Sequence, residues 1–563
     1  MSELITTGFG EALPPAPRHA ITFHLPKWAN LLRLLEKDQT LFNALKNTYP
    51  RMLPKPDVKA LAAALGEFLN LPPGTAVVIF TSLSSASECV EFATQTPRAE
   101  GMLDAPKGPD PVARDEISIR ALRVAKTGTK LFAVVLPAQN FPNVLQFWQN
   151  AGLGIQSRLA EQCLDNLDSL EEVTKDCSVS PRTESPGHVE VKERIAGLVE
   201  RAPVGGPRPV QVQADDIYLF QTGMTSIYRV HTWLLKANSL EAKTAFFGFA
   251  FYTTLQIFHE YGTGNKLIGP GTDEELIHLE AFLESEKNDG RKVQAIWFEF
   301  PSNPSLTVPN LSRLRDLADT YGCYLIADDT IGSFCNIDLL GPSGADIVVT
   351  SLTKSFSGYA DVMGASAILN PMASRYAELK DLFTQNYELD YCPLDAAVLA
   401  SNSRDYLVRA KTFNTNTQTL VSYFQSKVSD PKSCITGVLY PNTNPVFKAN
   451  FDAVKRPTTP EFEPGYGCLF SIEFESVEKL EVFYDCVNLH VGPHLGAHRT
   501  IMISYVKGLY GKQMEWARRF GLRETMLRIA TGLEDVEGLI GDFENALKVV
   551  DGLRGNFAND ADF

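Results

Sequence analysis

The sequence lacks an apolar run long enough to cross a membrane, so we expect no membrane-embedded segment and no membrane partner. The first thirty residues contain Pro14, Pro15 and Pro17 where a secretory signal peptide would need an unbroken apolar core. A cytoplasmic location is therefore the expectation.

Positive charge is also scarce. Fifty-two basic side chains face sixty-seven acidic ones, and the net charge of −15 would repel a phosphate backbone, so we expect no nucleic-acid partner. A local pocket for a small anion stays compatible with this balance. Nine cysteines are scattered without CxxC or metal-ligand spacing, which favours reduced thiols that pack as small hydrophobic residues and predicts no metal site.

At 563 residues, of which 44% are hydrophobic, the chain is long enough for two or three domains. Residues 1–150 form a predicted N-terminal extension domain, with helices over 31–47, 59–70 and 84–94 and strands over 76–81 and 130–136. We find no motif with a chemical mechanism in this part. A structural or oligomerisation role is the expectation for it.

Residues 151–210 have the composition of a linker and loop segment. The stretch 178–190 has few apolar residues and two prolines, so we expect it to be mobile, and a short helix is predicted over 191–201. Residues 211–400 then form a large domain and residues 401–563 a smaller α+β C-terminal domain.

Lys354 lies where a predicted core strand ends. Ile347, Val348 and Val349 are typical of a buried strand, and polar residues with the turn-prone Gly358 follow them. Ligands of open α/β sheets collect at the carboxyl ends of the strands, so the lysine should face a crevice. An amine partly removed from water is nucleophilic near neutral pH and can form a Schiff base with an aldehyde.

Four further residues follow predicted strands of the same domain. Gly223 begins a helix whose free N–H groups favour a phosphate, Tyr252 follows the strand over 243–250, Asn303 follows the strand over 292–300, and Asp328 closes the strand over 324–330. A helix between Asn310 and Gly322 gives the strand-helix-strand order of a mostly parallel, doubly wound sheet. A carboxylate such as Asp328 can keep a pyridine nitrogen protonated, which turns the ring into an electron sink.

These motifs resemble the Cys/Met-metabolism family of pyridoxal-phosphate enzymes, which have the fold type I scaffold. The similar segments are QTGM at 221–224, PSNP at 301–304, IADDT at 326–330 and SLTKSFSGYADVMG at 351–364. IQSR at 155–158, GPHLGAH at 492–498 and LRIATGLED at 527–535 resemble the fungal-type cystathionine γ-synthase branch.

The resemblance implies a role for each matching residue. Lys354, Asp328 and Tyr252 would be the catalytic group, with Lys354 bonded to pyridoxal 5′-phosphate, Asp328 on its ring nitrogen and Tyr252 stacked on the ring. The residues that would hold the phosphate are Gly223, Met224, Ser351, Thr353 and Arg158. Thr330 and Asn303 would also contact the cofactor. The residues that would contact the substrate are Arg528, Asn303, Thr500 and His494. Arg528 would clamp the substrate α-carboxylate.

The sequence departs from the resembled pattern near the substrate. Gln156 replaces the tyrosine of a Tyr-Ser-Arg triplet, Asp329 replaces the asparagine of Asp-Asn-Thr, Ala530 replaces a serine after Arg528, and His494 and Thr500 stand where relatives often have serine. The resemblance also implies a homodimer or homotetramer with shared active sites, so Arg158 would serve a partner's phosphate.

The reaction implied is γ-substitution on an O-acyl-L-homoserine, with O-acetyl expected and L-cysteine as the nucleophile that gives cystathionine. Because Gln156 and His494 differ near the substrate, a carbon nucleophile such as the β-keto acid acetoacetate stays open, as in fungal specialised metabolism. An O-acetylhomoserine sulfhydrylase, a γ-lyase and a non-catalytic regulatory relative are further alternatives. A nicotinamide-dependent enzyme is disfavoured because no GxGxxG lies between a strand and a helix.

Overall fold

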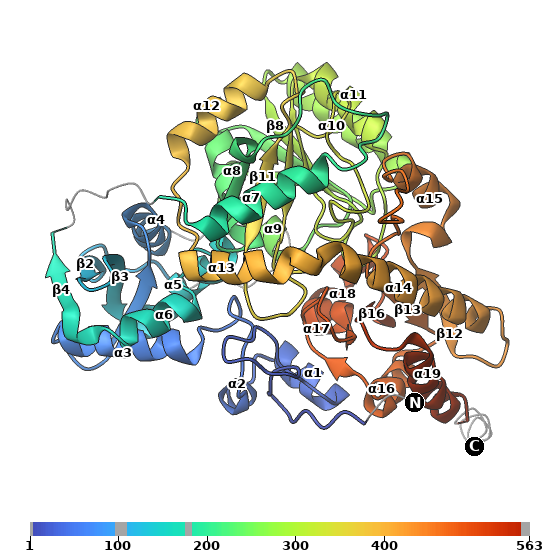
Figure 1. Cartoon of the computed structure of the whole chain (residues 1–563), viewed down its shortest axis with the longest axis horizontal. Coiled ribbons are helices and arrows are strands. Elements are labelled where there is room, and N and C mark those ends of the chain that lie inside the picture. The colour runs from blue at the N-terminus through green and yellow to red at the C-terminus, as the bar shows by residue number, and fades with distance from the viewer. Residues whose placement is uncertain (1–3, 96–109, 175–182, 553–563) are drawn as a thin grey trace.

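The computed structural model describes residues 4–95, 110–174 and 183–552, and Figure 1 shows them gathered around three sheets. The central sheet belongs to the large domain, and its strands follow the order β5-β11-β10-β9-β8-β6-β7. They span Ile217–Phe220 (β5), Lys243–Phe247 (β6), Asn265–Ile268 (β7), Val293–Glu299 (β8), Tyr324–Asp328 (β9), Ile347–Thr350 (β10) and Ala365–Leu369 (β11). Among these strands β11 alone runs antiparallel to its neighbours, so the predicted mostly parallel sheet is confirmed.

Helices cover both faces of the central sheet. Phe247 and Phe298 pack into one core cluster, whereas their sequence neighbours Phe246 and Trp297 pack into the other. The first cluster includes α7 (Pro186–Val199), α10 (Leu276–Asn288) and α11 (Leu311–Tyr321), and the second includes α8 (Gly223–Asn238), α9 (Tyr252–Glu260) and α12 (Tyr376–Asn386). Both faces are therefore buried, which explains why these strands are apolar runs without alternation.

The N-terminal sheet is antiparallel and has the order β1-β3-β2-β4. Its elements are α3 (Pro56–Phe68), β1 (Thr75–Phe80), α4 (Leu83–Thr94), β2 (Ser118–Val124), β3 (Thr129–Pro137), α5 (Phe141–Ala151), α6 (Ser157–Leu164) and β4 (Leu170–Val173). The helices predicted over 59–70 and 84–94 and both predicted strands are present. Because β4 completes this sheet, the N-terminal fold extends beyond residue 150 into the predicted linker.

The mobile linker predicted over 178–190 is wrong where the structure describes it. Residues 178–182 lie outside the described residues, but residues 186–190 already belong to α7. Ser185 caps this helix, since its backbone N–H donates to His188 Nδ1 at 3.0 Å, and His188 is buried against the carbonyl of Tyr391. The helix predicted over 191–201 therefore begins earlier, at Pro186.

The prediction of a single helix over 31–47 is also wrong, because the structure has two short helices there, α1 (Trp28–Leu35) and α2 (Gln39–Ala44). Lys37 has a left-handed φ of 55°, and the Asp38 side chain then accepts from the N–H of Thr40 to cap α2. The chain around α1 lies along the C-terminal domain, where the N–H of Leu25 donates to the Val491 carbonyl at 2.9 Å. Figure 1 shows α1 beside α17 (Tyr505–Tyr510).

The C-terminal domain contains the third sheet, in the order β12-β13-β16-β15-β14. Its strands are β12 (Ile435–Leu439), β13 (Leu469–Phe474), β14 (His490–Val491), β15 (Ile501–Ile503) and β16 (Met526–Ala530). The remaining helices are α13 (Pro393–Asn402), α14 (Tyr406–Val428), α15 (Pro445–Asp452), α16 (Val477–Cys486), α17 (Tyr505–Tyr510), α18 (Met514–Arg518) and α19 (Val536–Gly552). Ser471 of β13 donates to the Pro304 carbonyl at 2.9 Å, which fixes this sheet against the 301–304 turn of the large domain.

Across the three described ranges, no helix is both long and apolar enough to span a membrane, and no group of His, Cys, Asp and Glu side chains is arranged to hold a metal ion. Of the eight cysteines that the structure describes, all except Cys486 are buried, so the predicted packing role is confirmed for most of them. Cys177 falls outside the described residues.

Candidate active site

The carboxyl ends of two neighbouring parallel strands, β9 and β10, bring four predicted polar residues together. Asp328 at the end of β9 is in register with Val349 of β10, so Lys354 follows β10 on the edge where β9 ends. The backbone N–H of Ser351 donates to Thr330 Oγ1 at 2.8 Å, which ties the two strand ends to each other. The crossover topology thus gathers Asp328, Thr330, Ser351 and Lys354 at one edge of the sheet.

Lys354 is half-buried, and its amine lies between two side chains from distant parts of the chain. Its Nζ lies 3.4 Å from Tyr49 Oη and 3.4 Å from His494 Nδ1. Burial lowers the pKa of the Lys354 amine, Tyr49 partly opposes this effect, and the charges of Arg51 and Arg528 add to it. A lysine in this environment is a stronger nucleophile and base near neutral pH than an exposed one.

Two carboxyl groups, the buried Glu299 and the half-buried Asp328, lie at the same strand ends as Lys354. Glu299 of β8 is in register with Asp328, and burial together with the Asp328 charge raises the pKa of Glu299 to about 8. Burial likewise raises the pKa of Asp328, although a hydrogen bond with Thr330 opposes it. Two acids this close favour a cation or an N–H donor beside them.

Gly223 and Ser351 form a narrow cradle at the start of α8. A Cβ atom added at Gly223 would lie 3.0 Å from the Cβ of Ser351, so glycine keeps this approach open. The N–H groups of Gly223 and Met224 belong to the first turn of the helix, where helical geometry provides no acceptor for them. This arrangement suits a phosphate. The Met224 side chain packs in the core, and the Thr353 hydroxyl donates to the carbonyl of Gly364 at 3.1 Å.

Arg528 projects from the middle strand of the C-terminal sheet and is buried among uncharged groups. Its guanidinium donates to the Pro493 carbonyl at 2.9 Å and to Asn303 Oδ1 at 3.3 Å, and it lies 4.7 Å from the centre of the Tyr505 ring. Burial lowers the pKa of Arg528 to about 10. A buried guanidinium with neutral neighbours is strongly favoured by an added carboxylate.

Some predicted site residues are held by other partners. The Thr500 hydroxyl donates to Glu534 at 2.9 Å and accepts from the N–H of Gly532, so its contacts stay within the C-terminal domain. Arg158 pairs with Asp395 at 3.0 Å and with Asp361 at 3.6 Å in the same chain. Tyr252 begins α9, and its ring packs edge-on against Tyr510 at 5.7 Å.

The sequence interpretation missed four residues that the structure places at this site, namely Tyr49, Arg51, Glu299 and Tyr505. Glu299 could have been found, because it occupies the same strand-end layer as Asp328. Tyr49 and Arg51 carry no such signal, since the chain between them and Lys354 includes the whole N-terminal sheet.

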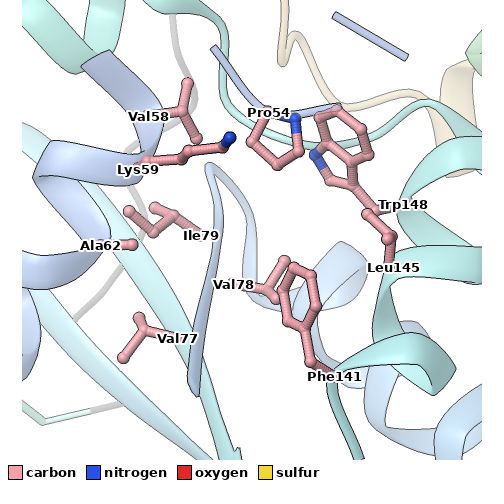
Figure 2. Close-up of a pocket in the computed structure, with 10 residues that line it drawn as sticks. All are labelled: Pro54, Val58, Lys59, Ala62, Val77, Val78, Ile79, Phe141, Leu145 and Trp148. Atoms are coloured by element: carbon pink, nitrogen blue, oxygen red, sulfur yellow. The ribbon is translucent and has the colours of Figure 1, made fainter. Parts of the chain in front are cut away.

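A separate apolar cavity of about 200 Å³ lies in the N-terminal domain. Figure 2 shows Val58, Lys59 and Ala62 of α3 on one side and Phe141, Leu145 and Trp148 of α5 on the other, with β1 between them. Its lining residues are distinct from the side chains around Lys354. The polar residues that the sequence predicts for catalysis lie around Lys354, and none of them lines this cavity.

The residues around Lys354 fit pyridoxal 5′-phosphate. The amine can bond to an aldehyde, the cradle at Gly223 suits a phosphate, and the Asp328 carboxyl suits a protonated ring nitrogen. Within the described chain, His494 Nε2 and Tyr505 Oη are buried without a hydrogen-bond partner, so polar groups next to Lys354 and Arg528 await a ligand.

Residues 212–548 match the family model described as Cys/Met metabolism PLP-dependent enzyme, and residues 57–156 match the model described as the N-terminal domain of a fungal trans-sulfuration enzyme. The cystathionine gamma-synthase-like enzyme iboG2 of Amanita muscaria is 31% identical, over 97% of each chain. The alanine racemase ungC of Aspergillus violaceofuscus is 32% identical, over 96% of each chain. The cystathionine gamma-synthase of Neurospora crassa is 29% identical, over 96% of this chain and 98% of that protein.

The solved structure of cystathionine gamma synthase from Xanthomonas oryzae, in complex with aminoacrylate and cysteine, superposes with a TM-score of 0.53. It is 17% identical, and the match covers 68% of this chain and 91% of that one. At this identity the likeness shows the fold, which is the predicted fold type I scaffold.

Proposed function

Because the chain belongs to the Cys/Met-metabolism family of PLP-dependent enzymes, we propose that it catalyses γ-substitution on an O-acyl-L-homoserine, with L-cysteine as nucleophile and cystathionine as product. The acyl group proposed is acetyl. The observation that carries the proposal is the position of Lys354 beside two buried proton carriers, opposite an arginine whose described partners are uncharged.

The cofactor is pyridoxal 5′-phosphate, which when bound supplies an electron sink for the charge left as protons leave the substrate carbons. Lys354 would hold its aldehyde, Asp328 its ring nitrogen, and Gly223, Met224 and Ser351 its phosphate. These roles are supported by the half-buried Lys354 amine, whose pKa is lowered, the half-buried Asp328 carboxyl, whose pKa is raised, and the glycine cradle.

Arg528 would bind the α-carboxylate of the amino acid. A bidentate guanidinium-carboxylate pair fixes the orientation of the substrate, so that its Cα–H bond points toward Lys354. Asn303 supports this clamp, since its side-chain oxygen accepts from the Arg528 guanidinium.

Lys354 would then move two protons. Its neutral amine takes the proton from Cα and, after releasing it, a proton from Cβ, and the Cγ–O bond breaks so that the acyloxy group leaves as a carboxylate. The cysteine thiolate adds to Cγ, and protons return to Cβ and Cα. The balanced reaction converts O-acetyl-L-homoserine and cysteine into cystathionine and acetic acid.

A second candidate uses the same donor with a carbon nucleophile such as acetoacetate. His494 supports it, because a neutral imidazole 3.4 Å from Lys354 can accept a hydrogen bond from the enol of a carbon acid while Lys354 takes the proton from carbon. Burial, with the nearby Lys354 charge, holds the pKa of His494 well below its ordinary value, which keeps the imidazole neutral. The relative named as an alanine racemase adds a third reaction that needs removal and return of a Cα proton.

Product analysis tests these candidates. The purified, cofactor-loaded protein would receive O-acetyl-L-homoserine with cysteine, with sulfide, with acetoacetate or with no nucleophile, and in a parallel sample L-alanine alone. Mass spectrometry and chiral chromatography would identify the products, with Lys354→Ala as the inactive control. Efficient formation of cystathionine supports the proposal. A carbon-bonded adduct with little cystathionine supports the second candidate, and homocysteine, an α-keto acid or D-alanine as the main product overturns both.

A further inference from the structure

The segment that precedes the N-terminal sheet reaches the catalytic lysine. Tyr49 is buried, its Oη lies 3.4 Å from Lys354 Nζ, and the centre of its ring lies 5.1 Å from the same nitrogen. The segment is held in place nearby, since Asn47 Nδ2 donates to the carbonyls of Ala20 and Thr22 at 2.9 and 2.7 Å. Tyr49 lies outside both matched family models, which cover residues 57–156 and 212–548.

We propose that Tyr49 is a catalytic residue that exchanges a proton with Lys354 during the reaction. In this step the Tyr49 phenolate takes a proton from the Lys354 ammonium group, which leaves a neutral phenol and a neutral amine. The reverse transfer returns the proton when the substrate carbon is protonated again. The proposal rests on the proposed function only through the role of Lys354 as the base at Cα.

The charges around Tyr49 favour this exchange. Burial raises the pKa of the Tyr49 phenol, but the charges of Lys354 and Arg51 outweigh burial, so the pKa lies below its ordinary value. The guanidinium of Arg51 lies 5.7 Å from the centre of the Tyr49 ring, and its other contacts, the Phe251 ring and the Gln149 carbonyl, are uncharged. The third titratable neighbour is His494, whose ring centre lies 6.1 Å away and whose buried imidazole is neutral.

A comparison with the buried Tyr484 shows why Tyr49 is distinctive. Tyr484 packs against Trp28 of α1, its hydroxyl is buried without a partner in the described chain, and burial raises its pKa strongly. The Tyr49 hydroxyl instead lies 3.4 Å from Lys354 Nζ, the nitrogen proposed to react. The phenol that contacts Lys354 thus comes from the segment that precedes the N-terminal sheet.

Tyr49→Phe tests the proposal, with Tyr484→Phe as the matched control for loss of a buried phenol that packs against the N-terminal segment. The first readout is exchange of the Cα proton of L-norleucine for solvent deuterium, measured by NMR on the holoenzyme. This amino acid has no leaving group, so the exchange needs the cofactor and Lys354 but not γ-substitution. We expect Tyr49→Phe to slow exchange about 100-fold, as is typical for loss of an acid-base group, and Tyr484→Phe to leave it unchanged.

The second readout does not depend on turnover. The absorption of the bound cofactor titrates with pH, and removal of the Tyr49 hydroxyl should shift the midpoint, because Lys354 loses its phenol partner. Arg51→Gln should raise the phenol pKa and move the pH profile of exchange upward, without loss of the cofactor. An exchange rate in Tyr49→Phe within about twofold of the natural protein, together with an unshifted absorption midpoint, would overturn the proposal. Failure of the proposed function is distinct, because it would appear as absence of cystathionine from the natural protein.

Discussion

Replacing Asp329 with asparagine should stabilise this protein at neutral pH. Asp329 follows directly after β9 and is 3% exposed. Burial raises the pKa of its carboxyl to about 7; the hydrogen bond from Thr350 opposes this rise, and the charge of Asp328 adds to it. Asparagine retains an oxygen that can accept from Thr350 but has no proton to lose.

The magnitude follows from the pKa of the Asp329 carboxyl. Below about pH 4 the group is protonated in both the folded and the unfolded protein, so it has no effect on the difference between them. Between about pH 4 and pH 7 the folded protein keeps a proton that the unfolded chain has lost, and rising pH therefore favours unfolding. The rise from the ordinary 3.8 to about 7 corresponds to a loss of at most about 4 kcal/mol above pH 7, which the substitution removes.

Melting temperatures of the holoenzyme, measured across this pH range, provide the assay. A unit of 150–250 residues shifts its Tm by about 2–4 °C per kcal/mol, so Asp329→Asn should gain up to the order of 10 °C above pH 7 and little near pH 4. Asp381→Asn on the exposed side of α12 is the control and should leave the pH dependence unchanged. A gain in Asp329→Asn that is the same at every pH, or a loss that grows as pH rises, would refute the reasoning.

Three further predictions concern the cofactor and the substrate. Arg528→Lys should raise KM for the amino-acid donor about 100-fold, because a point charge replaces a bidentate clamp. Steady-state kinetics on a holoenzyme with normal cofactor absorption would show whether KM rises while kcat is retained. Asp328→Asn should lower kcat by at least about 100-fold with little change in KM, since the amide cannot stabilise a protonated ring nitrogen, and an unchanged kcat would contradict that role. Arg158→Ala should weaken cofactor retention on gel filtration of the assembled protein, and unchanged retention with a lower Tm would mean that Arg158 serves only its buried pair with Asp395.

Much of the large domain could be predicted from the sequence, because its signals are local. Strand β10 is an apolar run that ends in hydroxyl residues and Lys354, and strand β9 ends in Asp328, so the order of elements along the chain already implies that both residues meet at one edge. The predicted helix over 31–47 failed for a local reason as well. Its apolar spacing continues through Lys37 and Asp38, but the left-handed turn and the cap at these residues divide it.

Contacts over long separations could not be predicted in the same way. Tyr49 meets Lys354 only because residues near the N-terminus pair with the C-terminal domain, as where the Leu25 N–H donates to the Val491 carbonyl. Composition and spacing within 1–50 give no indication of this partner. The linker prediction failed for a similar reason, since His188 is polar in the sequence but is buried by the distant carbonyl of Tyr391.

The crossing of the N-terminal segment to the C-terminal domain also determines when the active site can be assembled. The N–H of Ile5 donates to Asn488, and Lys354 contacts both Tyr49 and His494, so the N-terminal segment and the C-terminal domain contact each other and both contribute a side chain beside the reactive amine. During synthesis Tyr49 leaves the ribosome long before its partners Lys354 and His494, because most of the chain lies between them. The active site is complete only after Arg528, the proposed carboxylate clamp, has emerged, and contacts between distant parts of a chain form slowly. A nascent or truncated chain can therefore contain the cofactor lysine without the groups that control its protons.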